Sequence, residues 1–354
     1  MKRLIKKLII CFIVFGLFCS HVIAAPIITG VSGTVATGQN IIISGSSFGT
    51  KSPAAPLSFL NFEDALVGTI SNPYHGWTPS SGGGSTHWPI VVSSYGGRTS
   101  KMLRCNPSAS TGDMKSGIWI DGPAGKRYFY MTYDSYKSWP AGQSSRSKLF
   151  RIQGLVQNMP ELVLNMGMEA FVLLGNSGNS YVGPYVTLDR QVWSRDEVFL
   201  DSGTQGSTNA TAKFWEHLPG SRINSWQSPA FLLLEDSEPV QSFLLGYEFC
   251  DMTSQISHYL DNLYVDNTQS RVEIGNASTW NACTRREIQI PSAWSSGSIT
   301  VNVRQGTFPL GAAWLYVVDS SGNINSSGVP VTFGSDGGGS GGVPNPPLNL
   351  RRVE

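Results

Sequence analysis

The stretch "IIISGSSFGTKS", residues Ile41 to Ser52, raises the question that decides the architecture. Three isoleucines predict a β-strand, and the glycines at positions 45 and 49 frame a turn directly after it. A small sandwich would continue with a second strand within a few residues. The chain instead continues with Pro-Ala-Ala-Pro and a long aromatic-rich segment that does not read as the next strand of a small sandwich. We therefore look for the partner strands of this segment elsewhere in the chain.

Residues 271–334 offer such partners. Short apolar runs alternate there with turn residues, which is typical of a small β-sandwich. The predicted strands are Val272–Ile274, Glu287–Ile290, Ser298–Val303, Ala313–Val318 and Val329–Phe333.

The N-terminal segment "PIITGVSGTVATGQNIIISGSSFGT" resembles the first third of an immunoglobulin-like IPT/TIG domain. The matching features are Pro26 with Ile28, Gly38, the strand Ile41–Ser44 and the motif Gly45-x-x-Phe48-Gly49. The resemblance implies one sandwich in two pieces, residues 25–55 and 269–334, with Phe48 filling its end. The alternative is an irregular N-terminal arm followed by an independent C-terminal sandwich.

Residues 56–268 are long enough for a large sandwich, and strand candidates follow one another there without an amphipathic helix. Such an order favours antiparallel pairing and a jelly roll. An insertion at an exposed turn costs little loop entropy. The predicted fold is therefore all-β, with a large antiparallel jelly-roll sandwich inserted in a small Ig-like sandwich.

A second resemblance concerns this inserted part. "RYFYMTYDSYKSW" with "SKLFRIQG" resembles paired strands of the concanavalin A-like jelly rolls of secreted polysaccharide lyases and their relatives, and "HYLDNLYVDN" resembles their closing strand. The resemblance implies a concave sheet that binds glycan. The Glu-x-Asp-x-x-Glu signature of laminarinase-type hydrolases is absent, as are the Arg-x-Glu-x-Arg and Gln-x-His motifs of alginate lyases. No motif therefore supports catalysis.

The two ends of the chain differ in composition from the predicted sandwiches. Residues 1–24 combine a basic start with a short apolar run and small residues, which predicts a signal peptide. We expect a bacterial protein that is secreted or displayed at the cell surface, without membrane contact after cleavage. Residues 335–354 predict a flexible Gly/Pro-rich tail. A net charge of +1 and a charged fraction of 14% give no basic stripe for nucleic acid.

Aromatic and charged residues of the predicted jelly-roll strands are the candidates for carbohydrate contact. Aromatic rings stack on the apolar faces of sugars while charged groups orient their substituents. The predicted site consists of Tyr128, Tyr130, Lys148, Glu169, Trp215 and His217. The alternatives are ordinary strand tyrosines, a tryptophan at the edge of the core, and a structural ion pair of Glu169 with Arg151 or Lys148.

Two further sets of residues carry weaker hypotheses. In a lyase, a Tyr or His must abstract a proton next to a uronate carboxylate, and the candidates are His217, Tyr130 and Tyr259. Asp261 and Asp266 lie in an oxygen-rich run that could hold calcium, although a polar turn is the alternative.

Three cysteines remain after signal cleavage: Cys105, Cys250 and Cys283. A disulfide between Cys105 and Cys250 is possible inside the jelly roll, and the alternative is that all three are small buried apolar residues.

The leading functional prediction is extracellular binding of a polysaccharide or cell-surface glycan. A polysaccharide lyase or hydrolase on the jelly roll is one alternative, and a cell-surface adhesion or structural module is the other. Fold alone does not choose among these functions.

Overall fold

The computed structural model describes most of the chain between residues 24 and 334. The described ranges are 24–68, 70–82, 87–106, 112–123, 125–139, 147–154, 160–165, 170–175, 180–185, 188–219, 223–252, 256–306 and 308–334. The predicted signal peptide (apart from its last residue), Glu169 and the predicted tail lie outside these ranges.

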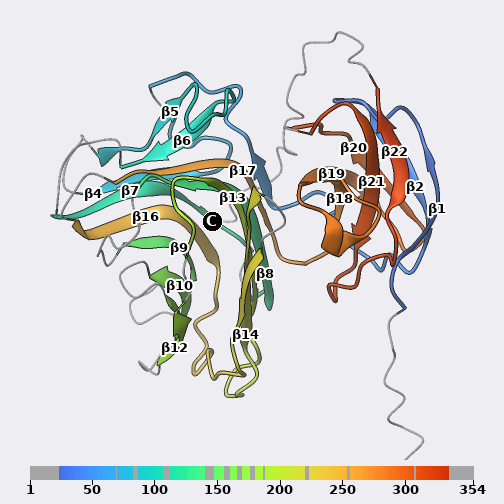
Figure 1. Cartoon of the computed structure of the whole chain (residues 1–354). Coiled ribbons are helices and arrows are strands. Elements are labelled where there is room, and N and C mark those ends of the chain that lie inside the picture. Colours follow the sequence, from blue (N-terminus) through green and yellow to red (C-terminus); the bar gives the residue numbers. More distant parts are fainter. Residues whose placement is uncertain are drawn as a thin grey trace, which may run out of the picture.

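Strands from both ends of the described chain pair in one continuous seven-stranded order (Figure 1). We call the unit that these strands form the small sandwich. In spatial order its strands are β1 (Ile27–Ser32), β2 (Asn40–Ser46), β20 (Ser298–Asn302), β19 (Arg286–Trp294), β18 (Arg271–Gly275), β21 (Gly311–Val318) and β22 (Val329–Phe333). In the ladder between β2 and β20, Ile41 lies opposite Val301 and Ser44 lies opposite Ser298. The partner strands of the opening stretch thus come from the far end of the sequence. Membership of the IPT/TIG family and the domain boundaries stay predictions.

Side chains of β2, β18, β20 and β21 meet in a shared core. Strand β2 alternates, with Ile41 and Ile43 fully buried and Ile42 exposed. Phe48, from the turn after β2, is also fully buried in this core. A Cβ atom at Gly45 would clash with the carbonyl oxygen of Ile27 and with the Phe48 ring. A glycine at position 45, near the end of β2, is therefore required for the close packing around Phe48.

Two antiparallel sheets form the large sandwich. The seven-stranded sheet runs in the order β12 (Ser180–Tyr185), β11 (Ala170–Leu174), β10 (Glu161–Asn165), β9 (Lys148–Gln153), β16 (Ser242–Met252), β7 (Gly112–Asp121) and β4 (Thr78–Gly82). The eight-stranded sheet runs in the order β15 (Ile223–Gln227), β14 (Thr211–His217), β13 (Trp193–Asp201), β8 (Tyr128–Lys137), β17 (His258–Asp266), β6 (Met102–Cys105) and β5 (Ile90–Val92), and β3 (Ser58–Leu60) pairs with β17.

The core of the large sandwich lies between its two sheets. Phe129, Met131 and Phe214 of the eight-stranded sheet pack in one cluster with Phe150 and Phe243 of the other sheet. This arrangement confirms the predicted all-β jelly-roll sandwich. Within the described residues, no helix is long and apolar enough to cross a membrane.

The chain leaves the small sandwich and returns to it at neighbouring points. The Nζ atom of Lys51, just after the opening stretch, lies 2.6 Å from Asp266 at the end of β17. It also lies within hydrogen-bond distance of the Tyr264 hydroxyl, at 3.2 Å. Both members of the Lys51–Asp266 pair are buried. This contact holds the two connections together where a strand of the large sandwich runs into a strand of the small one.

The possible disulfide between Cys105 and Cys250 is not formed, because Cys105 is a free, fully buried thiol, as the alternative of a small buried apolar residue requires. Cys105 packs in the core of the large sandwich, and burial raises the pKa of its thiol well above the ordinary value. Cys283 is also free and buried.

Replacing Phe48 with alanine should lower the free energy of unfolding by about 3–5 kcal/mol, because it leaves a cavity in the small sandwich. Ile42→Ala, at a position 46% exposed on the same strand, is the matched control and should cost much less. Chemical denaturation followed by circular dichroism measures both. Equal costs for the two variants would contradict this account of the core.

Candidate functional site

The outer face of the eight-stranded sheet lies against the small sandwich (Figure 1). Strands β8, β13 and β14 alternate, so that Phe129, Val198 and Phe214 point into the core and their neighbours point outward. Tyr130 and Glu197 are among the outward residues, yet both are almost fully buried. The small sandwich therefore covers part of this face.

Two glutamates and three arginines join the sandwiches. Glu273 of β18 accepts hydrogen bonds from Arg195 (2.7 Å), Arg271 (2.6 Å) and Arg286 (3.1 Å). Glu197 of β13 accepts from Arg271 at 2.6 Å. Each sandwich thus contributes one carboxylate and at least one guanidinium group. We call these five residues the buried ionic network.

Glu197 has two further partners from its own sheet. The Tyr130 hydroxyl donates to it at 2.7 Å, and His217 Nε2 lies 3.0 Å from its other oxygen. Burial opposes ionisation of both glutamates. The neighbouring arginines nevertheless lower the pKa of Glu273 to about 2, and Arg271 with His217 lowers the pKa of Glu197 well below its ordinary value. Burial lowers the pKa of His217, so its imidazole is held in the neutral form.

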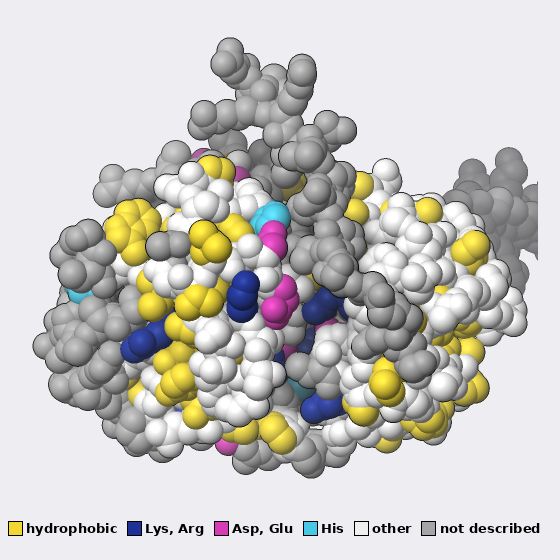
Figure 2. Space-filling view, turned by 90° about the horizontal axis from the view of Figure 1, so that it is seen from above, with side chains coloured by type: hydrophobic (Ala, Val, Ile, Leu, Met, Phe, Trp, Pro, Cys, Tyr) yellow, Lys and Arg dark blue, Asp and Glu magenta, His cyan; other side chains and the backbone are white. Residues whose placement is uncertain are grey.

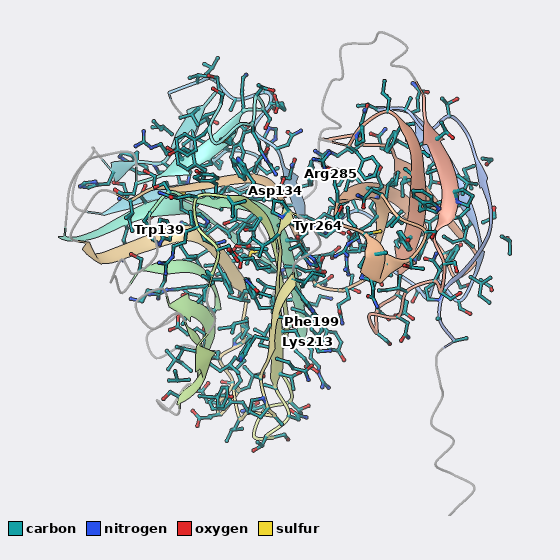
Figure 3. The ribbon with its side chains drawn as sticks, in the orientation of Figure 1. Asp134, Trp139, Phe199, Lys213, Tyr264 and Arg285 are labelled. Atoms are coloured by element: carbon teal, nitrogen blue, oxygen red, sulfur yellow. The ribbon has the colours of Figure 1, made fainter. Side chains whose placement is uncertain are left out.

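Apolar contacts surround the buried ionic network. Tyr130, Phe199 and Tyr264 of the large sandwich form a cluster with Ile288 of the small one, and Trp215 packs against it. Figure 3 shows Tyr264 on the side of the large sandwich that faces the small one. The guanidinium of Arg271 lies 4.6 Å from the centre of the Tyr130 ring. Aromatic faces on this sheet thus serve contact between the two sandwiches.

Beside this contact lies a cavity of about 1480 Å³, which we call the central cleft. Figure 2 looks onto a hollow between the two halves of the molecule in which basic and acidic side chains gather. Its walls come from both sandwiches. The large sandwich contributes Arg98, Asp134, Trp193 and Asp261, and the small one contributes Arg285, Glu287 and Arg304.

The polar wall of the central cleft is continuous across the two sandwiches. Arg98 pairs with Asp134 at 2.6 Å and lies 3.6 Å from Asp261, the residue opposite Asp134 on β17. Asn262 donates to Asp134 at 2.8 Å and accepts from Arg304 at 2.9 Å. Arg304 also donates to Glu287 at 2.7 Å.

The two facing aspartates differ in their protonation. Burial and the charge of Asp134 raise the pKa of Asp261 to about 8, against the opposing effect of Arg98. Burial acts on Asp134 in the same direction, but Arg98 and Asn262 lower the pKa of Asp134 below its ordinary value. The cleft wall therefore holds a protonated carboxyl group beside an ionised one at neutral pH. Paired groups with separated pKa values are common where acid and base chemistry occurs.

An aromatic cluster lies beside the central cleft, and Trp193 is its member on the cleft wall. The rings of Tyr95 and Tyr259 are stacked with centroids 3.7 Å apart, and Tyr136 lies 5.5 Å from Trp193. The Arg98 guanidinium lies 4.0 Å from the centre of the Trp193 ring. Tyr95 is 37% exposed, and Trp193 and Tyr136 are half-buried. We call Tyr95, Tyr136, Trp193 and Tyr259 the aromatic rim.

A glycine makes the aromatic rim possible. Gly96 has a φ angle of 59°, and a Cβ atom there would lie 2.8 Å from the Tyr136 ring and 2.9 Å from Trp193 Nε1. The backbone can therefore approach both rings only at a residue without a side chain.

The structure brings four of the six predicted carbohydrate contacts together. Tyr128, Tyr130, Trp215 and His217 share the outer face of the eight-stranded sheet. Lys148 belongs to β9 of the other sheet, opposite Asn165, so the predicted single groove is wrong in that respect. Glu169 lies outside the described residues.

Burial also corrects the predicted platform. Tyr130 is 1% exposed beneath the small sandwich, and His217 is held between Glu197 and Arg286. The alternation of aromatic and polar residues suits an interface as well as a sugar platform, and the sequence alone does not say what covers that face. Tyr128, which is 42% exposed, and half-buried Trp215 remain accessible.

The two predicted metal ligands are engaged with protein groups. Asp266 lies 2.6 Å from Lys51 and accepts from the Tyr264 hydroxyl at 3.0 Å. Asp261 accepts from Ser100 at 3.0 Å. Across the described ranges, no group of three or more His, Cys, Asp or Glu side chains is placed to hold a metal ion. The calcium hypothesis stays a prediction.

Sequence reasoning missed most of the central cleft. Arg98 and Tyr95 come from a loop after β5, and Trp193 begins β13, so their meeting depends on tertiary structure. One usable signal exists: strand alternation places Asp134 and Tyr136 on the same face as Tyr130. The Gly96-Gly97 turn beside a tyrosine and an arginine is a second, weaker signal.

Comparisons with known proteins give structural neighbours alone. No family model and no curated protein matches the chain. An alginate lyase from Aplysia kurodai aligns with 50% of this chain and 86% of its own, at 10% identity and a TM-score of 0.39. Lectin II from Ulex europaeus aligns with 60% and 99%, at 7% identity and a TM-score of 0.39. The carbohydrate recognition domain of Emp47p aligns with 62% and 99%, at 12% identity and a TM-score of 0.37.

These neighbours are all jelly rolls. Their identities and TM-scores are too low for the likeness to carry an argument about the site or its ligand. What the chain binds must therefore be argued from its own residues.

The Asp261→Asn variant should change the pH dependence of stability. Because the folded-state pKa of Asp261 is raised to about 8, the folded protein binds a proton that the unfolded chain releases above about pH 4. This contribution to stability is complete below the unfolded pKa and is lost as the pH rises toward 8. The variant lacks it, so the free energy of unfolding should fall less between about pH 5 and about pH 8 than in the parent protein. Identical slopes in denaturant titrations would show that Asp261 is ionised in the fold.

The Glu273→Gln variant should lower the free energy of unfolding by about 3–5 kcal/mol, because it leaves buried arginines without their partner. Asp201→Asn breaks the pair with Arg127, whose side chain is 43% exposed, and serves as the matched control with a cost of at most about 1 kcal/mol. Thermal and denaturant unfolding measure both. A neutral Glu273→Gln variant would mean that the network does not hold the sandwiches together.

Proposed function

We propose that the protein is an extracellular carbohydrate-binding protein and that a glycan lies in the central cleft, against Trp193. The observation that carries this proposal is the position of Trp193, half-buried at the cleft wall beside Arg98 and Asp134. Sugar sites combine a ring face for the apolar side of a pyranose with fixed charged groups for its hydroxyls.

The shape of the central cleft favours a polymer as the ligand. Figure 2 shows the cleft as a hollow between the two sandwiches that reaches the surface, so part of a polymer can contact its walls. The small sandwich contributes Arg285, Arg304 and Glu287 to the cleft walls, and the large sandwich contributes Arg98, Asp134 and Asp261. A polysaccharide or cell-surface glycan, whose hydroxyl groups can both donate and accept hydrogen bonds, fits this mixture of charged groups. Export by the N-terminal signal peptide, to the cell surface or beyond, is part of the same proposal.

Trp193→Ala should weaken glycan binding by about 1–3 kcal/mol, by analogy with central aromatic anchors at interfaces. The matched control is Trp88→Ala, because Trp88 is 41% exposed and lies outside the cleft walls. A glycan array identifies the ligand, and calorimetry with that glycan measures both variants.

Three outcomes of this experiment are informative. Equal affinities for Trp193→Ala and the parent protein, with the fold intact by circular dichroism, would remove the central cleft from the site. Loss of binding in Trp215→Ala instead would return the site to the platform that the sequence predicts around Trp215 and Tyr128. Binding to no glycan at all would leave the adhesion module as the better proposal.

A polysaccharide lyase or hydrolase is the second candidate function. The pair of Asp134 and Asp261 favours it, because one carboxyl is protonated and the other ionised on the cleft wall. The test is incubation of the bound polysaccharide with the parent protein and with Asp261→Asn. New reducing ends or unsaturated products with the parent protein alone would support an enzyme, and unchanged polymer with both would support binding alone.

A further inference from the structure

A charged cluster lies inside the large sandwich, on the inner face of the eight-stranded sheet. The Nζ atom of Lys137, at the end of β8, lies 3.1 Å and 3.4 Å from the two carboxylate oxygens of Asp196. It lies 3.0 Å from Glu216 Oε1. All three side chains are fully buried, with 0% exposure.

Rigid strands hold these three residues. They come from the adjacent strands β8, β13 and β14, and Asp196 lies directly opposite Glu216. All three point inward, like Met131, Val198 and Phe214 on the same strands. The amine is thus fixed against one carboxylate with a second carboxylate beside it, and water is excluded.

The two carboxylates have different surroundings. Glu216 Oε2 accepts hydrogen bonds from Asn224 at 2.9 Å and from the Asp189 backbone at 3.2 Å. Asp196 presents both oxygens to Lys137, and its Oδ1 also accepts a hydrogen bond from Ser194 at 2.8 Å. Glu216 is therefore anchored as an acceptor, and Asp196 faces the amine.

Burial acts on this cluster by disfavouring separated charges. It raises the pKa of Asp196 above its ordinary value, against the opposing effect of Lys137. Burial also acts to lower the pKa of Lys137, but Asp196 and Glu216 together raise it. Attack by the amine requires its unprotonated form, so one proton must first pass from Nζ to Asp196, which exchanges the ion pair for a neutral amine beside a neutral carboxylic acid.

We propose that Lys137 and Asp196 are joined by an intramolecular amide bond, with Glu216 as the residue that carries the proton. The Nζ lone pair attacks Asp196 Cγ and forms the N–C bond. Glu216 takes a proton from Nζ and delivers it to the departing hydroxyl group. The Cγ–O bond then breaks, and one water molecule leaves. The step needs no oxidant, reductant or co-reactant.

The bond would link β8 to β13 in the middle of the eight-stranded sheet. It would close the chain between residues 137 and 196 into a loop, which restricts the unfolded chain as a disulfide does. The sheet that carries the aromatic rim and Glu197 would then resist unfolding more strongly than its noncovalent contacts allow.

The test is peptide mapping by mass spectrometry on the purified full-length protein after incubation at neutral pH. We expect the peptide that contains Lys137 and the peptide that contains Asp196 to appear as one joined species, lighter than their sum by one water. Fragment ions should place the link between the two residues. Recovery of two separate peptides at full mass would overturn the proposal. A loss of water confined to the Asp196 peptide would indicate a cyclic imide and would also overturn it.

Two variants test the role of Glu216. Glu216→Gln keeps the size of the side chain but removes the proton carrier, so the two peptides should remain separate. Lys213→Arg, on the outer face of the same strand, is the matched control and should retain the joined species. A joined species in Glu216→Gln at the parent level would contradict the assigned role of Glu216.

Discussion

Contact between the two sandwiches depends on Glu197 and Glu273, two buried carboxylates that Arg271 joins. Each carboxylate comes from a different sandwich, and Arg271 contacts both, at 2.6 Å in each case. A buried charge without its partner is costly, so separating the sandwiches requires the rehydration of the whole network. The apolar contacts of Tyr130, Tyr264 and Ile288 around it exclude water and strengthen each pair.

The position of the central cleft follows from this contact. Asp134 and Trp193 belong to the large sandwich, Glu287 and Arg304 belong to the small one, and Asn262 accepts from Arg304 across the gap. A cleft whose walls are already bridged loses little conformational freedom when a ligand enters. Such preorganisation suits the recognition of a flexible polymer, because ordering the polymer on binding already costs conformational entropy. The buried ionic network also holds the small sandwich over part of the outer face of the eight-stranded sheet, so that not every aromatic residue of this face can contact a sugar.

Much of the fold could be predicted from the sequence, but little of the candidate site could. Buried and exposed positions alternate in β2, and apolar and polar residues alternate in parts of residues 271–333, because a strand that is buried on one face has a period of two. The strands predicted in these two segments were the basis for predicting that the segments pair in one sandwich. Strand parity also placed Tyr128, Tyr130, Trp215 and His217 on one face. It did not reveal that the small sandwich covers Tyr130, or that Lys148 belongs to the opposite sheet, because both depend on contacts between distant segments. The aromatic rim escaped prediction for the same reason.

A distance measurement between the sandwiches tests most directly whether the buried ionic network fixes the central cleft. Gln205 of the large sandwich and Ser320 of the small one are both exposed and can carry spin labels. Pulsed electron paramagnetic resonance then measures the distance between the two labels in the protein without a glycan. We predict one narrow distribution of distances in the parent protein and a broader one in Glu273→Gln. A distribution that is already broad in the parent protein would contradict the account, because the cleft would then not exist before the ligand binds.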